Sequence, residues 1–235
     1  MNLLIIVKSD FINGNLARIS DRRCEHILTV HKAKEGDQLQ VGLLNGKVGT
    51  ATITQLNTSF IELHVTLNKN PPDPLPLILI IALPRPKMIK RILQTCATMG
   101  VKDIVFLNSY RVEKSYWQTP LLYEENIQEQ LILGLEQGKD TMLPRVRLEK
   151  RFKPFAEDHL PALCEQSLAL VAHPTSTNPC PRDITQQTTL VIGPEGGFIP
   201  YEIEKLEAVG CKGITLGSRI LRVETAIPVL LSKLF

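Results

Sequence analysis

Two glycine-containing segments decide the fold of this chain: Gly193-Pro194-Glu195-Gly196-Gly197-Phe198 and Leu216-Gly217-Ser218-Arg219-Ile220-Leu221-Arg222-Val223-Glu224-Thr225-Ala226. Each follows a short apolar run, 189–192 and 213–216, that predicts a buried strand, and each precedes a helical pattern. Glycine at the end of a strand lets the backbone turn sharply and approach a ligand, because no Cβ is in the way. Two such loops at the carboxyl ends of strands predict a ligand site.

Strand and helix patterns alternate ahead of these segments. The run 77–82 is apolar throughout, as in a strand buried on both faces of a sheet. Apolar residues at helical spacing follow from Met88 to Ala97, and Gly100 ends that helix. Further strands are expected at 103–107 and 168–172, and a further helix at 121–135. About five strands joined by helices predict an α/β fold with a parallel sheet.

The N-terminal part of the chain has a different pattern, that of a small β-barrel. Short β-type runs lie at 3–7, 38–44, 48–55 and 60–65. Asn45-Gly46 between two of these runs is a strong hairpin signal, because both residues tolerate positive φ. The proline-rich stretch that follows is not helical and stiffens a linker. The expected organisation is a barrel at 1–70, a linker at 71–76 and an α/β domain at 77–235.

Bulk composition is that of an ordinary globular protein, with 235 residues of which 43% are hydrophobic and 22% charged. The longest apolar stretch, 75–83, has about half the length of a membrane span and contains Pro76. Residues 1–8 carry neither a basic region nor a cleavage site, so we expect a first strand, no signal peptide and a cytoplasmic location. The five cysteines are scattered without a CxxC pair, and no metal site is expected.

Basic residues are unevenly distributed along the chain. Residues 74–102 contain five basic side chains and no acidic one, and a second basic cluster spans 145–153. The members of the two clusters are Arg85, Lys87, Lys90, Arg91 and Lys102, and Arg145, Arg147, Lys150, Arg151 and Lys153. Such clusters are suited to a phosphate backbone, although solvated helix faces often have the same composition. Charge alone therefore leaves RNA binding open.

The two glycine-containing segments together resemble the signature of the RsmE family, bacterial methyltransferases that act on N3 of a uridine in small-subunit (16S) ribosomal RNA. The resemblance implies a SPOUT-type α/β domain with a C-terminal trefoil knot, S-adenosylmethionine as cofactor and a homodimer. It also implies that 26–37 belongs to a PUA-like RNA-binding barrel. The apolar run 226–231 is expected to start the last helix, with Pro228 in its first turn and part of its surface left for a partner subunit.

The resemblance also assigns roles to single residues. Those expected to bind the cofactor are His173, Gly193, Pro194, Glu195, Gly196, Gly197, Leu216, Gly217, Ile220, Leu221 and Thr225. Those expected to contact RNA are Lys32, Arg85, Lys87 and Arg111. Arg219 and Arg222 are catalytic candidates, because they would bind RNA phosphates or stabilise negative charge on the uracil oxygens.

Carboxylates provide the candidate proton acceptors. Glu224 with Thr225, or Glu195, would take the N3 proton or position the base. The alternative for Glu224 is an acid in the first turn of a helix, where it complements the helix dipole. Glu202 and Glu204 are expected to be such helix-start acids, behind Pro200 at the first turn.

Departures from the family pattern lie outside the predicted cofactor loops. The segment Thr98-Met99-Gly100-Val101 lacks the glutamate that the family has there. After the Glu136-Gln137 pair, this chain has Asp140 where the family has an arginine. Lys32 likewise replaces an arginine of the family. Three functions therefore stay open: the uridine-N3 methyltransferase, a related SPOUT methyltransferase with another RNA target, and an RNA-binding protein without catalysis. A Rossmann dinucleotide enzyme is a weaker fourth, because no GxGxxG follows the first strand of the α/β part.

Overall fold

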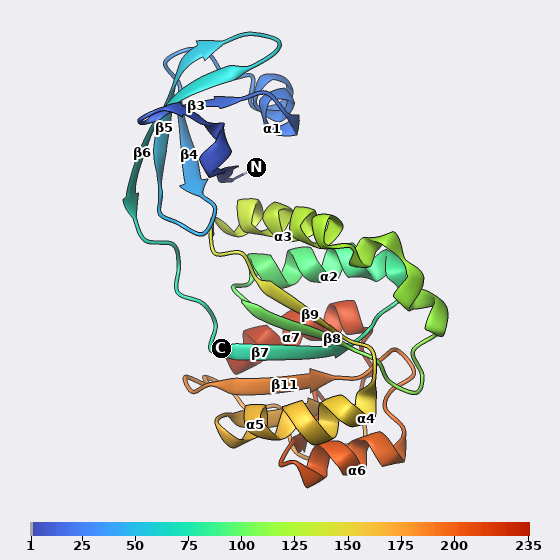
Figure 1. Cartoon of the computed structure of the whole chain (residues 1–235). Helices are drawn as coiled ribbons and strands as arrows, with labels where there is room; N and C mark the ends of the chain where they lie inside the picture. Colours follow the sequence, from blue (N-terminus) through green and yellow to red (C-terminus); the bar gives the residue numbers. More distant parts are fainter. Residues whose placement is uncertain (1) are drawn as a thin grey trace. The chain divides into compact units, whose positions relative to one another are not determined.

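The computed structural model describes residues 2–235 and divides the chain into two units (Figure 1). The first unit contains the residues up to Asp73 together with Ile132–Leu143, and the second contains Pro74–Leu131 and Pro144–Phe235. The segment 132–143 therefore clusters with the N-terminal unit, although it lies far from it in the sequence. Each unit is described by itself.

The first unit is built on a curled six-stranded sheet with the order β1-β4-β5-β6-β3-β2 (Figure 1). Its strands are β1 Leu4–Ile6, β2 Phe11–Asn13, β3 Leu16–Ile19, β4 Gln38–Leu43, β5 Val48–Leu56 and β6 Ile61–Lys69. The pair β1–β4 is parallel and the other pairs are antiparallel. Within residues 2–235 the edge strands β1 and β2 are not paired with each other, so the sheet expected to form a small β-barrel is a curled half-barrel.

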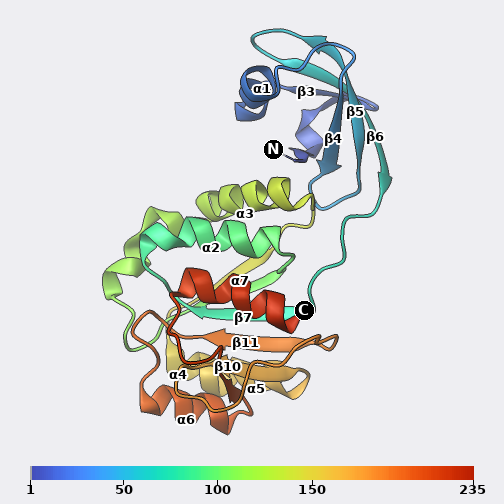
Figure 2. The same ribbon diagram turned by 180° about the vertical axis from the view of Figure 1, so that it is seen from behind.

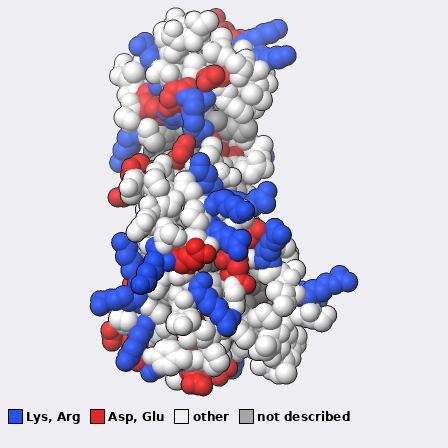
Figure 3. Space-filling model, turned by 90° about the vertical axis from the view of Figure 1, so that its right-hand side faces the viewer, with Lys and Arg blue, Asp and Glu red and all other residues white. Residues whose placement is uncertain are grey.

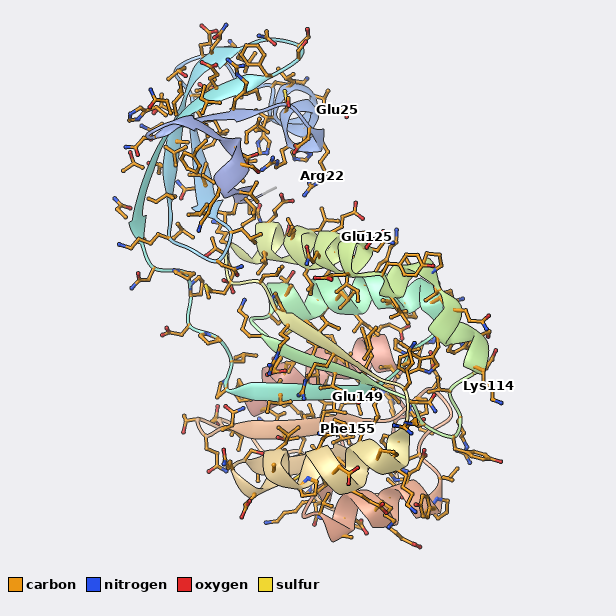
Figure 4. All side chains as sticks on the ribbon, viewed as in Figure 1. Arg22, Glu25, Lys114, Glu125, Glu149 and Phe155 are labelled. Atoms are coloured by element: carbon orange, nitrogen blue, oxygen red, sulfur yellow. The ribbon has the colours of Figure 1, made fainter. Side chains whose placement is uncertain are left out.

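A short helical segment follows β3 in the first unit. Helix α1, Arg22–His26, continues into a π-helical turn, Ile27–His31, which ends at Lys32 with a left-handed φ of 50°. From this segment Arg22 (Figure 4) donates hydrogen bonds of 3.1 and 3.2 Å to the buried carboxylate of Glu136. Asp140 is also buried and accepts a 2.9 Å bond from the Met142 N–H. Glu136 and Asp140, the two acidic residues of the motif that departs from the family pattern, thus make hydrogen bonds that stabilise the first unit.

The second unit contains a six-stranded sheet in which every pair is parallel, with the order β12-β10-β11-β7-β8-β9. The strands are β7 Leu77–Ala82, β8 Asp103–Leu107, β9 Arg145–Glu149, β10 Leu168–Ala172, β11 Thr188–Ile192 and β12 Lys212–Ile214. The expected parallel α/β architecture is confirmed. Strand β9 was not expected, because Arg145 and Arg147 mask the strand pattern; both pair with Asp103 on β8, at 2.7 and 3.6 Å.

Helices cover both faces of this sheet. They are α2 Pro86–Thr98, α3 Glu124–Gly138, α4 Phe152–Pro154, α5 Leu160–Glu165, α6 Pro200–Ala208 and α7 Val223–Leu234; the residues of α3 from Ile132 onward belong to the first unit. The second unit also has 3-10 turns at Lys114–Gln118 and Pro120–Leu122 and a π-helical turn at Phe155–His159, and the first unit has a 3-10 turn at Lys8–Asp10. Helix α7 packs beside α2, and Figures 1 and 2 show α7 on one side of the sheet with α4 and α5 on the other.

Helix α7 differs from expectation in where it begins. It begins at Val223, so Pro228 lies inside the helix instead of in its first turn. Its residues Ile227, Leu230 and Leu231 are buried by the rest of this chain, and Val229 is the large apolar side chain of 226–231 that is exposed. The chain itself therefore covers most of the apolar surface of this helix and leaves Val229 exposed, and the homodimer stays a prediction.

Candidate cofactor pocket and RNA-facing surface

A pocket opens in the second unit where β10, β11 and β12 end. It contains about 700 Å³ of empty space, counted out to its open mouth and including open solvent there. Its walls are formed by Ala172, His173, Pro174, Ile192, Gly193, Pro194, Glu195, Gly197, Phe198, Ile214, Thr215, Leu216, Gly217, Arg219, Ile220, Leu221, Val223, Ala226 and Leu230. Three adjacent parallel strands thus place their following loops around one cavity, as expected for this sheet type.

The structure brings most of the predicted cofactor residues together on this wall. Of that set, Gly196 and Thr225 are the two that do not line the pocket. Of the catalytic candidates, Arg219 lines it, whereas Arg222 is the N-cap residue of α7 and Glu224 lies in the first turn of α7. Glu224 therefore occupies the helix-start position that was its alternative interpretation.

The loop 193–198 is a tight turn anchored in the core. The Gly197 N–H donates to the Pro194 carbonyl at 2.8 Å, and Gly197 has a φ of +73° that favours glycine. The Phe198 ring is buried, and a Cβ at Gly193 would lie 3.1 Å from it. The close approach at Gly193 is thus to the chain's own phenylalanine, while Glu195 and Gly197 face the cavity.

The loop 215–222 forms the opposite wall. Gly217 has a φ of +115°, and a Cβ built there would meet no atom within 4 Å. The Thr215 hydroxyl holds this turn, because its Oγ1 accepts from the Gly217 N–H at 3.2 Å. The side chain of Ile220 is 80% exposed at the pocket. This wall therefore offers open backbone and apolar surface to a ligand.

His173 supplies a polar group from the third loop. The backbone N–H of His173 donates to the Ile214 carbonyl at 2.9 Å, which fixes the loop to β12. The ring Nδ1 lies 2.8 Å from the Thr175 hydroxyl. Burial lowers the pKa of His173, so the ring is neutral at physiological pH and is suited to hydrogen bonding with a polar ligand atom.

Residues that the sequence did not single out for this role hold the loop 193–198 in place. The Glu202 carboxylate is buried and accepts from the Tyr110 N–H at 2.7 Å and the Ile199 N–H at 3.0 Å. Arg111 donates from Nη1 to the Gly196 carbonyl. On the other side, the Arg85 N–H donates to Glu195 Oε1 at 3.3 Å. Three segments far apart in sequence thus fix one wall of the pocket.

The Glu202 contacts predict a stability effect. Replacing Glu202 with Gln puts an NH₂ group in place of one acceptor oxygen, so one buried backbone N–H loses its partner at a cost of about 1–3 kcal/mol. Glu204→Gln on the exposed face of the same helix is the matched control and should change stability by less than about 0.5 kcal/mol. Urea unfolding of both variants measures the difference, and equal midpoints would contradict the anchoring role.

Cationic side chains gather near the pocket. Figure 3 shows Lys and Arg concentrated on the side of the second unit to which β7 and β11 point in Figure 1. Of the predicted RNA contacts, Lys87 is exposed in the first turn of α2, while Arg85 and Arg111 are exposed but also bonded to the loop 193–198. Lys32 is exposed in the first unit.

Residues 2–235 contain no group of three or more His, Cys, Asp or Glu side chains placed to hold a metal ion. In the same residues, no helix has the length and apolar character needed to cross a membrane.

Comparison with known proteins identifies the family. The model of the RNA methyltransferase domain matches residues 71–235, which include the whole parallel sheet and the pocket. The chain belongs to the RNA methyltransferase family. It is similar along nearly its whole length to curated members named ribosomal RNA small subunit methyltransferase E. The Treponema pallidum protein is 28% identical over 232 residues, covering 96% of this chain and 87% of the relative.

A second such relative, from Borreliella burgdorferi, is 25% identical over 229 residues, covering 96% of this chain and 94% of the relative. Solved structures support the fold of this family member. A Legionella pneumophila methyltransferase in complex with SAM has a TM-score of 0.76 at 24% identity, covering 98% of this chain and 95% of that one. The Neisseria gonorrhoeae ribosomal RNA small subunit methyltransferase E, bound to S-adenosyl methionine, has a TM-score of 0.73 at 21% identity, covering 99% of this chain and 95% of that one.

Proposed function

We propose that this chain is an S-adenosylmethionine-dependent methyltransferase that modifies N3 of a uridine in 16S ribosomal RNA. The observation that carries the proposal is the pocket formed by three strand-end loops within the part of the chain that matches the RNA methyltransferase family. The names of the curated relatives support the ribosomal target.

The pocket residues fit S-adenosylmethionine. Apolar side chains such as Ile192, Leu216 and Leu230 suit an adenine ring, and the open space beside Gly217 admits a ligand close to the backbone. Few polar groups face the cavity, and among them neutral His173 suits a hydroxyl group of the ribose. When bound, this cofactor supplies an electrophilic methyl group on a sulfonium.

The protein's own residues have two tasks at the uracil. The N3 proton must leave, because neutral N3 has no usable lone pair, and negative charge then develops on the ring oxygens. Arg219 lies on the pocket wall and stabilises that charge. Glu195 reaches the cavity and is the better placed carboxylate to accept the proton, whereas Glu224 lies at the start of α7 outside the lining residues.

The finer assignments rest on the family resemblance. We propose a SPOUT-type knotted domain, a PUA-like role for the half-barrel in RNA binding, a homodimer, and action in the cytoplasm. The departures at Thr98 and Asp140 favour testing more than one RNA target.

The decisive experiment incubates the chain and S-adenosylmethionine with assembled small subunits and with naked 16S RNA, followed by nucleoside mass spectrometry. The expected result is 3-methyluridine at one position. Methylation of another nucleotide would favour a related methyltransferase with a shifted target. Cofactor binding without any methylation would favour an RNA-binding protein that has lost catalysis.

Exposed cations on α2 predict a graded effect on RNA affinity. Lys87, Lys90 and Arg91 are exposed on this helix, and each alanine substitution should reduce the slope of log affinity against log salt by roughly 0.7–0.9. Lys212→Ala on β12 is the control and should leave the slope unchanged. Filter binding across a salt series measures it, and unchanged slopes for the α2 variants would place the RNA elsewhere.

A further inference from the structure

Tyr110 is a large aromatic side chain held out in solvent by a fixed backbone. Its side chain is 78% exposed, although its neighbours Ser109 and Val112 are buried. The Val112 N–H donates to the Ser109 carbonyl at 3.0 Å and closes a turn around it. Its own N–H is bonded to buried Glu202 at 2.7 Å. The ring is therefore exposed because hydrogen bonds hold the backbone of this turn in place, and not because the loop is disordered.

This turn is fastened to the pocket at two points. Glu202 joins the Tyr110 N–H to the Ile199 N–H, at the end of the loop 193–198. Arg111 donates to the carbonyl of Gly196, which lies between the pocket residues Glu195 and Gly197. The turn follows β8, and Figure 4 shows its neighbour Lys114 on the side to which β7 and β11 point. Tyr110 thus lies beside the rim of the pocket, next to a cation.

The pocket wall itself offers no exposed Phe, Tyr or Trp ring within the described chain, since Phe198 is its one such residue and is only 4% exposed. Unpaired RNA bases are commonly bound by stacking on aromatic rings or on arginine guanidinium planes. Tyr110 supplies the ring that the wall lacks, and Arg111 next to it adds positive charge for the adjoining phosphates.

We propose that Tyr110 stacks on an unpaired nucleobase of the RNA beside the pocket and so holds the strand while the target uridine enters. The inference rests on the proposed function and adds a positioning residue to it. Stacking is sequence-tolerant because every base has a π-face. Tyr110 therefore binds and positions the RNA strand, and the pocket selects the uridine.

The test measures binding of a single-stranded RNA oligonucleotide that carries 2-aminopurine beside the target uridine, without cofactor. Wild-type chain should quench the fluorophore on binding. Tyr110→Ala should lose about ten- to a hundredfold in affinity, abolish the quenching and raise KM for RNA with little change in kcat. Tyr110→Phe and Tyr110→Trp should restore both affinity and quenching, because they retain a ring. The salt slope should stay unchanged, in contrast to the lysine variants of α2.

Tyr123→Ala is the matched control, since Tyr123 is also exposed, at 56%, but precedes α3; it should bind like the wild type. S-adenosylmethionine affinity reports whether each variant is folded. If the wild type methylates RNA and Tyr110→Ala binds and quenches equally well, the inference is overturned and the proposed function stands. If the wild type binds neither cofactor nor RNA, the proposed function itself is overturned.

Discussion

Replacing Arg219 with alanine should reduce the rate of methylation by about 10²–10³-fold, while affinity for S-adenosylmethionine stays within a few fold. Arg219 lines the pocket, and in the proposed mechanism its guanidinium stabilises the negative charge that develops on the uracil oxygens. A charge aimed at that position matters mainly in the transition state, so its loss lowers kcat more than it weakens ground-state binding. Single-turnover methylation and calorimetry with the same protein separate the two quantities.

Arg222 and Arg182 provide graded comparisons for this variant. Arg222 is exposed outside the lining residues, at the N-cap of α7, so Arg222→Ala should act on RNA affinity and the salt slope, with a loss of about tenfold or less. Arg182 is exposed in the same unit away from the pocket wall, and Arg182→Ala should stay within about twofold. Normal methylation by Arg219→Ala would show that the arginine is structural and that the site has been misassigned.

The sequence predicted those parts of the second unit in which local pattern and burial agree. Strands β7, β8 and β10 have the expected bounds, because unbroken apolar runs in a parallel sheet leave no competing periodicity. The two glycine loops and the loop at His173 do meet at one cavity. Their convergence followed from a general property of parallel sheets, since loops after adjacent strands share one edge.

Failures occurred where tertiary contacts override the local pattern. Charged and apolar residues alternate along β9, which lies at the edge of the sheet. Its ion pairs with Asp103 join residues far apart in the sequence and cannot be read from the residue pattern. Helix α7 begins at Val223, and the side chain of its N-cap residue Arg222 makes no capping hydrogen bond, so no start signal preceded the apolar run. Whether the curled sheet of the first unit closes depends on strand order, which hydrophobic alternation does not encode and which was not predicted.

The contacts that position the site were likewise beyond the sequence. Glu202 has the pattern of a helix-start acid, and it does cap Ile199, yet the same carboxylate also holds Tyr110 from a loop 92 residues away. Arg111 was expected to bind RNA, but its guanidinium also binds the Gly196 carbonyl. Each role depends on which loops become neighbours, and only the folded chain shows that.

Replacing Gly217 with valine should weaken S-adenosylmethionine binding by at least about tenfold, through two additive effects. Gly217 has a φ of +115°, which a β-branched residue adopts only with strain, at a cost of roughly 1–3 kcal/mol. A Cβ there meets nothing within 4 Å, so the added side chain would project into open space at the pocket wall. Calorimetric titration with S-adenosylmethionine measures the loss.

Gly210→Val separates strain from obstruction of the pocket. Gly210 has a similar φ of +96° and open surroundings, but it lies in the turn between α6 and β12, outside the lining residues. Both variants should therefore lose stability in thermal unfolding, and Gly210→Val alone should retain cofactor affinity. Equal losses of affinity would mean that strain acts through the whole unit. Wild-type affinity in Gly217→Val would show that the ligand does not approach this wall, and the assignment of the pocket to the cofactor would fail.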